Sequence, residues 1–416
     1  MSPPSTGAAT FFMLSVSEAR ERILVAIQSV ETQTVSLDHA AGRILASDIT
    51  AGIDLPPFDN SSVDGFALQA ADSVNVQTIR VIADIRAGTS STIAIERGEC
   101  ARIMTGAPLP KGAEAVVMVE DTNFDGRIPD HAAPRMITIN KQVHPGENVR
   151  QRGDDLHKGE TVISKGTRLR AQEMGLLATL GAAEIILYRK PLLALLSSGD
   201  ELLPVEADLT PGKIHESNSY ALAALAESAG MELLRLGVAK DSETDIRSRL
   251  EKAVEAKADV IVSSAGVSVG AFDYVRKVIE TDGELNFWKI NMRPGKPLVF
   301  GKYRGIPFFG LPGNPVSAFI GFEVFVRPAL EKLSGLTVRP RPYQNAILGQ
   351  PIESDGRESY LRVVVVEENG RLVARLTGHQ GSGNILSLVC ANALLIVPSG
   401  VKSLPASSEV KIWPIA

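Results

Sequence analysis

Aromatic residues and cysteines are scarce in this sequence. Phe, Trp and Tyr make up 5% of the 416 residues, which argues against a stacking platform for single-stranded nucleic acid. The two cysteines, Cys100 and Cys390, have neither a CxxC partner nor a histidine nearby. The 6 histidines are scattered without the spacing of metal ligands. Neither a zinc site nor a disulfide framework is therefore expected, and two reduced thiols suit the cytoplasm.

The sequence also lacks an excess of positive charge and any long apolar run. The formal net charge is −5, so no nucleic-acid partner is expected. No run reaches the length of a membrane-spanning helix, and FFML at 11–14 is too short for the apolar core of a signal peptide. We therefore expect a cytoplasmic protein with no membrane partner. Walker and GxGxxG motifs are absent as well, which removes common routes to nucleotide binding.

Apolar residues make up 44% of the chain, and their pattern predicts a central α/β domain. From Pro191 to about Gly335, short continuous apolar runs alternate with amphipathic stretches. Apolar strands that alternate with helices in this way indicate a doubly wound, mostly parallel sheet. We assign this domain to residues 189–336.

The flanking segments predict smaller domains, so the expected fold class is multidomain, α/β plus β. Short β-type runs between Gly and Pro turns indicate a β-rich inserted domain over 51–157. Residues 14–50 and 158–188 would form a split, extended linker domain with helical and β segments. Residues 337–416 contain YLRVVVVEENGRLVARL, two strands about an Asn-Gly turn, and predict a small C-terminal β-barrel.

Four loops follow the predicted strands of the α/β sheet, at residues 197–202, 238–241, 263–273 and 310–317. Ligands of such sheets bind beyond the carboxyl ends of the strands. Three of the loops carry a carboxylate that could hold Mg²⁺: Glu201, Asp241 and Asp273. In the third loop, the backbone amides of Gly266, Ser268 and Gly270 are typical of a phosphate cradle, although an ordinary strand–turn–helix connection has the same composition.

The segment FWKINMRPGKP at 287–297 predicts a local cationic pocket. In one extended strand, Lys289, Asn291 and Arg293 would share a face, with Lys296 just beyond the Pro-Gly turn. Such a cluster in an acidic protein suits an oxyanion or a phosphate. A solvated edge of charges is the alternative, and the apolar residues on the opposite face argue against it.

Two polar segments outside the α/β domain are also candidates. Asp59 and Asp64 bracket small polar residues in PFDNSSVDGFA, and Thr105 follows a predicted strand. The segment NVRQRGDDL at 148–156 presents Arg150 and Asp155. Asx turns and a solvated run of charges are the alternative explanations.

Together these segments resemble the MoeA-type molybdopterin molybdenumtransferase family, which includes gephyrin-like proteins. The resemblance extends from about Pro56 to Pro398, over nearly the whole chain. The matching stretches, in the family's order, are PPFDNSSVDGFA, RIMTGAPLPKGA, NVRQRGDDL, LSSGDEL, SNSYAL, AGVSVGAFDYV, FWKINMRPGKP, GLPGNPVS and GHQGSGNILSLVCANALLIVP.

The resemblance implies an enzyme that joins molybdate to the dithiolene of adenylylated molybdopterin and releases AMP with Mg²⁺. It implies a homodimer whose active site lies between subunits, and it makes a molybdopterin adenylyltransferase a possible partner. The catalytic residues would be Asp59, Thr105, Asp155, Glu201, Asp241, Asp273, Lys289 and Arg293, with Glu201, Asp241 and Asp273 as candidate Mg²⁺ ligands. The substrates would bind at Ser198, Gly199, Gly266, Ser268, Gly270, Lys296, Pro312, Gly313, Asn314 and Ser382.

The sequence departs from the family pattern at three positions. Ala265 lies where the family often has a second glycine, Arg293 where it often has Lys, and Ser198 where Thr is common. Arg keeps the charge but offers a planar fork of donors, which could change the preference among oxyanions.

Three alternatives compete with this interpretation. The first, an adenylyltransferase on the same α/β unit, is disfavoured because that domain usually occurs without the flanking β domains. The second, a non-catalytic pterin-binding scaffold, would not need the carboxylates and Lys289 intact. The third is a tungstate-preferring homologue, and tungstate and molybdate are too alike in size and charge for the sequence to separate them.

Overall fold

The computed structural model describes residues 13–89, 92–124, 132–265 and 271–415, with Ala265 and residues 271–273 described by their backbone alone. The chain divides into two compact units. The larger unit contains the described parts of Met1–Ser47, Gly166–Met174 and Glu184–Ala416, and the smaller unit those of Asp48–Lys165 and Gly175–Ala183. No helix in these described ranges is long and apolar enough to cross a membrane.

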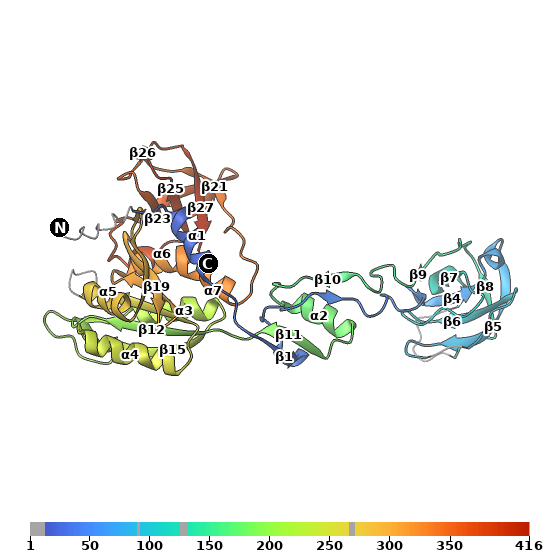
Figure 1. The fold of residues 1–416 in the computed structure, drawn as a ribbon. Helices are drawn as coiled ribbons and strands as arrows, with labels where there is room; N and C mark the ends of the chain where they lie inside the picture. The colour runs from blue at the N-terminus through green and yellow to red at the C-terminus, as the bar shows by residue number, and fades with distance from the viewer. Residues whose placement is uncertain (1–12, 90–91, 125–131, 266–270, 416) are drawn as a thin grey trace, which may run out of the picture. The chain divides into compact units, whose positions relative to one another are not determined.

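A six-stranded sheet forms the centre of the larger unit (Figure 1). Its first four strands in spatial order are parallel, and the last two run antiparallel to their neighbours. In that order the strands are β15 (Glu232–Ala239), β12 (Leu192–Ser198), β16 (Val260–Ala265), β20 (Ile306–Pro312), β19 (Pro297–Tyr303) and β17 (Gly283–Lys289).

Helices cover both faces of this sheet. Because side chains alternate along a strand, Leu193 and Leu195 of β12 join one apolar cluster, and Ala194 and Leu196 join another. The second cluster contains α4 (Glu243–Glu255) and α5 (Ala271–Asp282). The first contains α1 (Val16–Ala26), α3 (Asn218–Ser228), α6 (Pro315–Gly321), the π-helix η4 (Phe322–Val326) and α7 (Arg327–Leu333). The predicted doubly wound, mostly parallel α/β domain is confirmed.

Helix α1 packs in the α/β core although its residues were assigned to the linker domain. Ser15 is its N-cap, and Glu18 completes a capping box. The apolar face of the helix, Val16, Ala19 and Ile23, is buried in the first cluster described above. Burying this face is favourable, and the core of the α/β domain is where the chain buries it.

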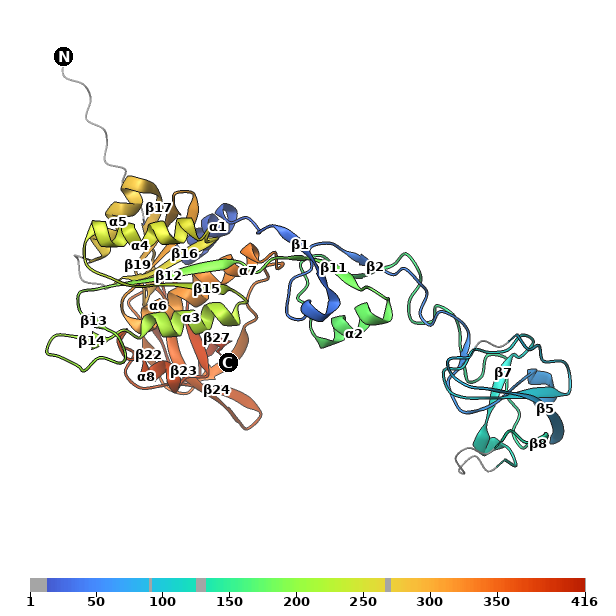
Figure 2. The ribbon, with the colours of Figure 1, turned by 90° about the horizontal axis from the view of Figure 1, so that it is seen from below.

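Five strands of the C-terminal segment close into a barrel, which confirms that prediction. The strands of this segment lie together in Figure 2, in orange and red. The predicted turn joins β23 to β24, and Asn369 and Gly370 there have φ of 51° and 74°. A short strand, β18 (Met292–Arg293), adds to β23. Around the barrel the strands are β23 (Glu358–Glu368), β24 (Arg371–Leu376), β21 (Gln344–Leu348), β27 (Glu409–Pro414) and β25 (Ala393–Val397), which pairs back with β23.

Shorter elements complete the larger unit. Strand β1 (Thr32–Ser36) pairs with β11 (Glu184–Tyr188) in an antiparallel ladder. The remaining elements are the 3₁₀ turn η1 (Leu37–His39), the pair β13 (Leu202–Leu203) and β14 (Ile214–His215), the pair β22 (Ile352–Glu353) and β26 (Ser403–Leu404), and the helix α8 (Leu386–Val389).

The smaller unit is β-rich, as predicted for the inserted domain. Its five-stranded sheet has apolar clusters on both faces: Phe66 and Leu68 lie in one, and Ala67 lies in the other. In order, the strands are β7 (Ala115–Met118), β4 (Gly65–Leu68), β6 (Glu99–Ile103), β5 (Gln77–Ile85) and β8 (Met136–Ile139). Further elements are the pair β3 (Asn60–Ser61) and β9 (Val149–Arg150), the pair β2 (Ile49–Thr50) and β10 (Thr161–Ile163), the turns η2 (Ala70–Ser73) and η3 (Val119–Asp121), and α2 (Ala171–Thr179), which crosses the division. The exact domain limits given above stay predictions.

Candidate active site

The four parallel strands of the α/β sheet end in one row. Ser198, the last residue of β12, lies opposite Ala239 of β15 on one side and opposite Ala265 of β16 on the other. Ala265 in turn lies opposite Pro312 of β20. The loops that follow these residues therefore begin side by side, as ligand-binding loops of parallel sheets do. The fold thus brings the predicted substrate residues Ser198, Gly199 and Pro312 to one edge of the sheet.

Three carboxylates gather where β12 and β15 end. The backbone N–H of Asp241 donates to Oδ1 of Asp200 at 3.2 Å. Oδ1 of Asp241 is buried and has no hydrogen-bond partner among the described residues. Burial, together with the negative charges of Asp200 and Glu201, raises the pKa of Asp241. A buried carboxylate oxygen that lacks a donor suits a cation.

The described residues include the side chains of two of the three predicted Mg²⁺ ligands, Glu201 and Asp241. Among the described residues, no group of three or more His, Cys, Asp or Glu side chains is arranged to hold a metal ion. Glu201 lies against Gly199, where a Cβ would come within 2.7 Å of its Oε2. The third predicted ligand is Asp273, whose side chain lies outside the described part of the chain. Gly266, Ser268 and Gly270 of the phosphate cradle also lie outside it, so these assignments stay predictions.

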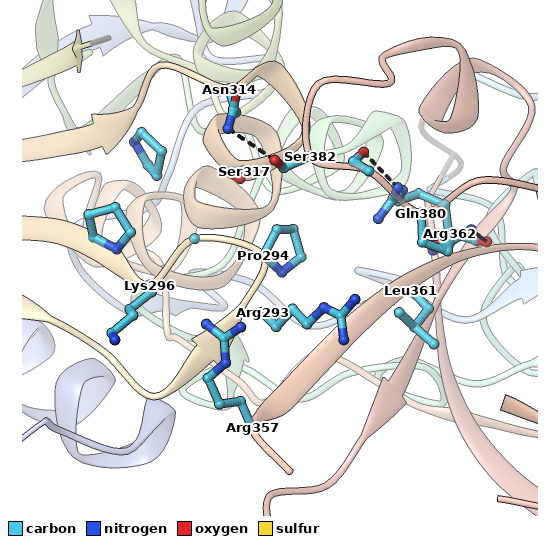
Figure 3. A pocket seen from close by; sticks show the side chains of 14 residues that line it. Arg293, Pro294, Lys296, Asn314, Ser317, Arg357, Leu361, Arg362, Gln380 and Ser382 are labelled. Carbon is cyan, nitrogen blue, oxygen red and sulfur yellow. Dashed lines mark hydrogen bonds between the residues drawn. The ribbon is translucent and has the colours of Figure 1, made fainter. Parts of the chain in front are cut away.

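A cationic pocket of about 330 Å³ lies where residues next to the α/β sheet meet the barrel (Figure 3). Figure 3 shows four cationic side chains around it: Arg293, Lys296, Arg357 and Arg362. None of the described lining residues is an Asp or a Glu. The rest of the lining is Pro294, Gly295, Pro297, Pro312, Asn314, Ser317, Leu361, Gln380, Gly381 and Ser382.

Arg362, in the middle of β23, is 0% exposed. Its Nε donates to Oγ of Ser387 and its Nη2 to the carbonyl oxygen of Gly381, both at 3.0 Å. Both acceptors are neutral. Burial, and after it the charge of Arg293, lowers the pKa of Arg362 to about 10. A buried cation held by neutral acceptors costs free energy of folding, so this position indicates a site for an anion.

Asp355 partly balances two of the other cations. Nε of Arg357 donates to its Oδ2 at 3.0 Å, and Nη1 of Arg293 lies 3.9 Å from the same oxygen. The hydrogen bond from Arg357 lowers the pKa of Asp355. One carboxylate beside four cationic side chains leaves the pocket with a net positive charge.

Two predicted substrate residues join the two sides of the pocket. Nδ2 of Asn314, in the loop after β20, donates to Oγ of Ser382 in the barrel at 3.0 Å. The backbone N–H of Val316 donates to the carbonyl oxygen of Ser382 at 3.1 Å. Asn314 and Ser382 therefore lie in the same pocket as Arg293 and Lys296.

The prediction of one extended strand through Lys289 and Arg293 was wrong, and Lys289 does not line this pocket, although its backbone lies opposite Pro297 of the lining. Strand β17 ends at Lys289, and β18 begins at Met292 in another sheet. The chain turns between them, where the N–H of Met292 donates to the carbonyl oxygen of Ile290 at 2.9 Å. Nζ of Lys289 lies 3.6 Å from the centroid of the Trp288 ring, and Lys289 is not among the described lining residues.

Asp59, Thr105 and Asp155 are exposed residues of the smaller unit. Pairing of β3 with β9 brings the segments of Asp59 and Asp155 together. Oδ1 of Asp59 accepts from the N–H of Arg152 at 2.7 Å. The N–H and Oγ1 of Thr105 donate to Oδ1 of Asp64 at 2.7 and 2.9 Å. These bonds join segments 93 and 41 residues apart in the sequence, so they are not local Asx turns. The catalytic roles of the three residues stay predictions.

Sequence reasoning missed Arg357, Arg362 and Gln380. Arg362 did leave a signal, because it is a charged residue within the apolar run YLRVVVV. Lys and Arg are almost never fully buried without a partner. A cation in such a run therefore indicates a functional site. No comparable signal marks Arg357 or Gln380, whose places depend on how the barrel packs.

Comparison with known proteins places the chain in a family. Three family models match it: "MoeA N-terminal region (domain I and II)" over residues 14–181, "Probable molybdopterin binding domain" over 194–332, and "MoeA C-terminal region (domain IV)" over 345–415.

Relatives of similar length support the same assignment. A molybdopterin molybdenumtransferase of Haemophilus influenzae is 35% identical and aligns over 97% of this chain and 98% of its own. A protein of the same name from Bacillus subtilis is 34% identical over 96% of this chain and 93% of its own. The crystal structure of a molybdopterin biosynthesis MoeA protein from Pyrococcus horikoshii matches with a TM-score of 0.80 at 31% identity, covering 97% of this chain and 100% of that one. With three matching models and relatives that align end to end, the chain belongs to the MoeA family.

Proposed function

We propose that this chain is a molybdopterin molybdenumtransferase, which inserts molybdate into the dithiolene of adenylylated molybdopterin. The observation that carries the proposal is the cationic pocket around Arg362. Molybdate is a tetrahedral dianion, and the pocket offers it four cationic side chains. A volume of about 330 Å³ exceeds that of one MoO₄²⁻ ion and leaves room for the group that receives the metal. The names of the full-length relatives support the same activity.

The residues of the pocket have different roles in this proposal. Arg293, Lys296 and Arg357 attract the dianion and neutralise its charge. Arg362 donates hydrogen bonds from a buried position, where such bonds are strong because water is excluded. Asn314 and Ser382 contribute polar groups that orient the oxygens. Molybdate is thereby held at one place beside the loops that end the α/β strands.

AMP release would take place at the loops that follow β15, β12 and β16, away from the cationic pocket residues that follow β20. We propose that the phosphates of the adenylylated pterin bind the loop over 263–273 and that Mg²⁺ is held by Glu201, Asp241 and Asp273. The orphaned Oδ1 of Asp241 supports a cation there. When bound, Mg²⁺ supplies neutralisation of the charge on the phosphates.

The assembly is part of the proposal. We propose a homodimer in which Asp59, Thr105 and Asp155 of one subunit complete the active site of the other. We also propose a cytoplasmic location, and a molybdopterin adenylyltransferase as the partner that supplies the substrate. The family resemblance of these segments supports this arrangement.

The test is AMP release from adenylylated molybdopterin with Mg²⁺. It is measured without oxyanion, with molybdate, and with tungstate. Release that depends on molybdate supports the transferase, and faster release with tungstate identifies a tungstate-preferring enzyme. A chain that binds the pterin but releases no AMP with either oxyanion is a scaffold, and the proposal is then wrong.

A further inference from the structure

Asn218, at the start of α3, makes two short hydrogen bonds to neighbouring strand ends. Its Nδ2 donates to Oγ of Ser264 at 2.7 Å and to the carbonyl oxygen of Gly313 at 2.6 Å. A side-chain amide nitrogen carries two hydrogens, so both are used. Ser264 lies near the end of β16, and Gly313 directly follows β20. Asn218 therefore joins two of the strands whose loops form the site.

The bond to Gly313 continues into the cationic pocket. Gly313 precedes Asn314, whose amide donates to Ser382 at 3.0 Å. Gly381, next to Ser382, accepts from Nη2 of Arg362 at 3.0 Å. A continuous path of hydrogen bonds and peptide units thus leads from Asn218 to the buried guanidinium. Asn218 is itself not among the described lining residues.

The first turn of α3 is built around the strand ends and not around its own cap. Ser217 is the N-cap residue, but its side chain makes no capping hydrogen bond, although serine is favoured there for that bond. Glu216, 4% exposed, accepts from Oγ of Ser197 at 3.0 Å and from the N–H of Ser219 at 2.7 Å. Glu216 therefore fixes this turn against β12, and Asn218 is held in place between β16 and β20.

We infer that Asn218 is a positioning residue for oxyanion binding. It fixes the carbonyl of Gly313, and so places Asn314 and Ser382 beside Arg362. The inference rests on the proposed function, because it deepens the account of the same pocket. Gly313 has no side chain of its own to anchor it, and the bond from Asn218 holds its carbonyl.

The test measures molybdate binding to the full chain by isothermal titration calorimetry. The substitution Asn218→Ala removes the hydrogen bond to Gly313. It is expected to weaken molybdate binding about tenfold, the effect of one hydrogen bond of this kind. Asn218→Asp keeps the size but removes both donors, and it is expected to weaken binding at least as much. Ser217→Ala is the matched control, because its exposed side chain makes no cap bond, and it should bind as the wild type does. Thermal denaturation checks that each variant is folded.

A double-mutant cycle with Asn314→Ala separates positioning from a general loss of structure. If Asn218 acts through Asn314, its substitution costs much less affinity once Asn314→Ala is present. Losses that simply multiply contradict the inference, as does equal binding by wild type and Asn218→Ala. A wild-type chain that binds no molybdate contradicts the proposed function instead.

Discussion

The burial of the charged Arg362 side chain is not favoured by packing alone. Arg362 occupies the middle of a barrel strand, is 0% exposed, and is held by neutral acceptors. An apolar residue of similar length would cost less to bury, because replacing buried ions by hydrophobic groups is often neutral or stabilising. An anion bound in the pocket, as proposed above, would supply the negatively charged partner that Arg362 lacks among the described residues.

Arg362→Met is expected to weaken molybdate binding by about 10- to 100-fold, the range for a hydrogen bond to a charged group. The melting temperature without ligand should be unchanged or higher, since an unpaired buried cation is removed. Calorimetry and thermal denaturation measure the two effects. Arg375→Met, which removes an exposed ion pair with Glu368 on the same barrel, is the control and should leave binding intact. Full molybdate affinity in Arg362→Met would remove this residue from the site.

The raised pKa of Asp241 leads to a prediction about how pH and Mg²⁺ affect stability. Burial raises its pKa, so folding favours its protonated form. Its contribution to stability is therefore present at low pH and is lost as the pH rises through the folded-state pKa. Without Mg²⁺ at pH 8, Asp241→Asn should be at least as stable as the wild type.

Mg²⁺ should then raise the melting temperature of the wild type more than that of Asp241→Asn, because only the wild type gains a neutralised carboxylate. Glu206→Gln changes an exposed carboxylate in the loop between β13 and β14 and should respond as the wild type does. An equal response of wild type and Asp241→Asn to Mg²⁺ argues against Asp241 as a ligand.

At the scale of elements, the turn after β17 decides which cations reach the pocket. It separates Lys289 from Arg293 and directs Arg293 and Lys296 into the lining. Gly295 lies in the next turn, between β18 and β19, with φ of 102°, and a Cβ there would come within 2.9 Å of Cε of Met292. Only glycine adopts such a backbone conformation without strain.

Gly295→Ala is expected to lower the free energy of unfolding by about 1 kcal/mol or more and to weaken molybdate binding, because the turn moves. Gly305→Ala is the matched control: φ is 85° and nothing lies within 4 Å of an added Cβ, and it joins β19 to β20. It should lose similar stability and keep its affinity. Chemical denaturation and calorimetry measure both, and equal affinity of the two variants would show that the turn does not set the pocket.

The elements that local patterns describe were predictable. The capping box at Ser15 and the Asn-Gly turn at 369–370 depend on residues a few positions apart. The prediction of one strand through Lys289 and Arg293 was wrong because no local pattern marks its end. Alternation of polar and apolar residues continues across the turn at Ile290–Met292, so the sequence pattern does not mark where the strand ends.

At the scale of the whole molecule, the proposed homodimer makes a prediction about mixed subunits. Asp59→Asn and Asp241→Asn should each abolish turnover, since each removes one side of the same site. Mixed and allowed to exchange, they should recover about a quarter of the wild-type rate, because half of the dimers then contain one intact site of two. AMP release measures the rate. Each variant mixed with itself is the control, and no recovery despite confirmed exchange contradicts a shared site.

The sequence by itself determined the class of fold, the family and five of the 14 residues that line the pocket. Strand and helix periods, the order of the segments, Arg293, Lys296, Pro312, Asn314 and Ser382 could all be taken from it, because each depends on neighbouring residues or on a recognisable motif. The tertiary structure alone decided that Arg357, Arg362 and Gln380 face this pocket and that Lys289 does not. Those places depend on barrel closure and on one turn, which bring together side chains from positions 293 to 382 by packing that no local pattern records.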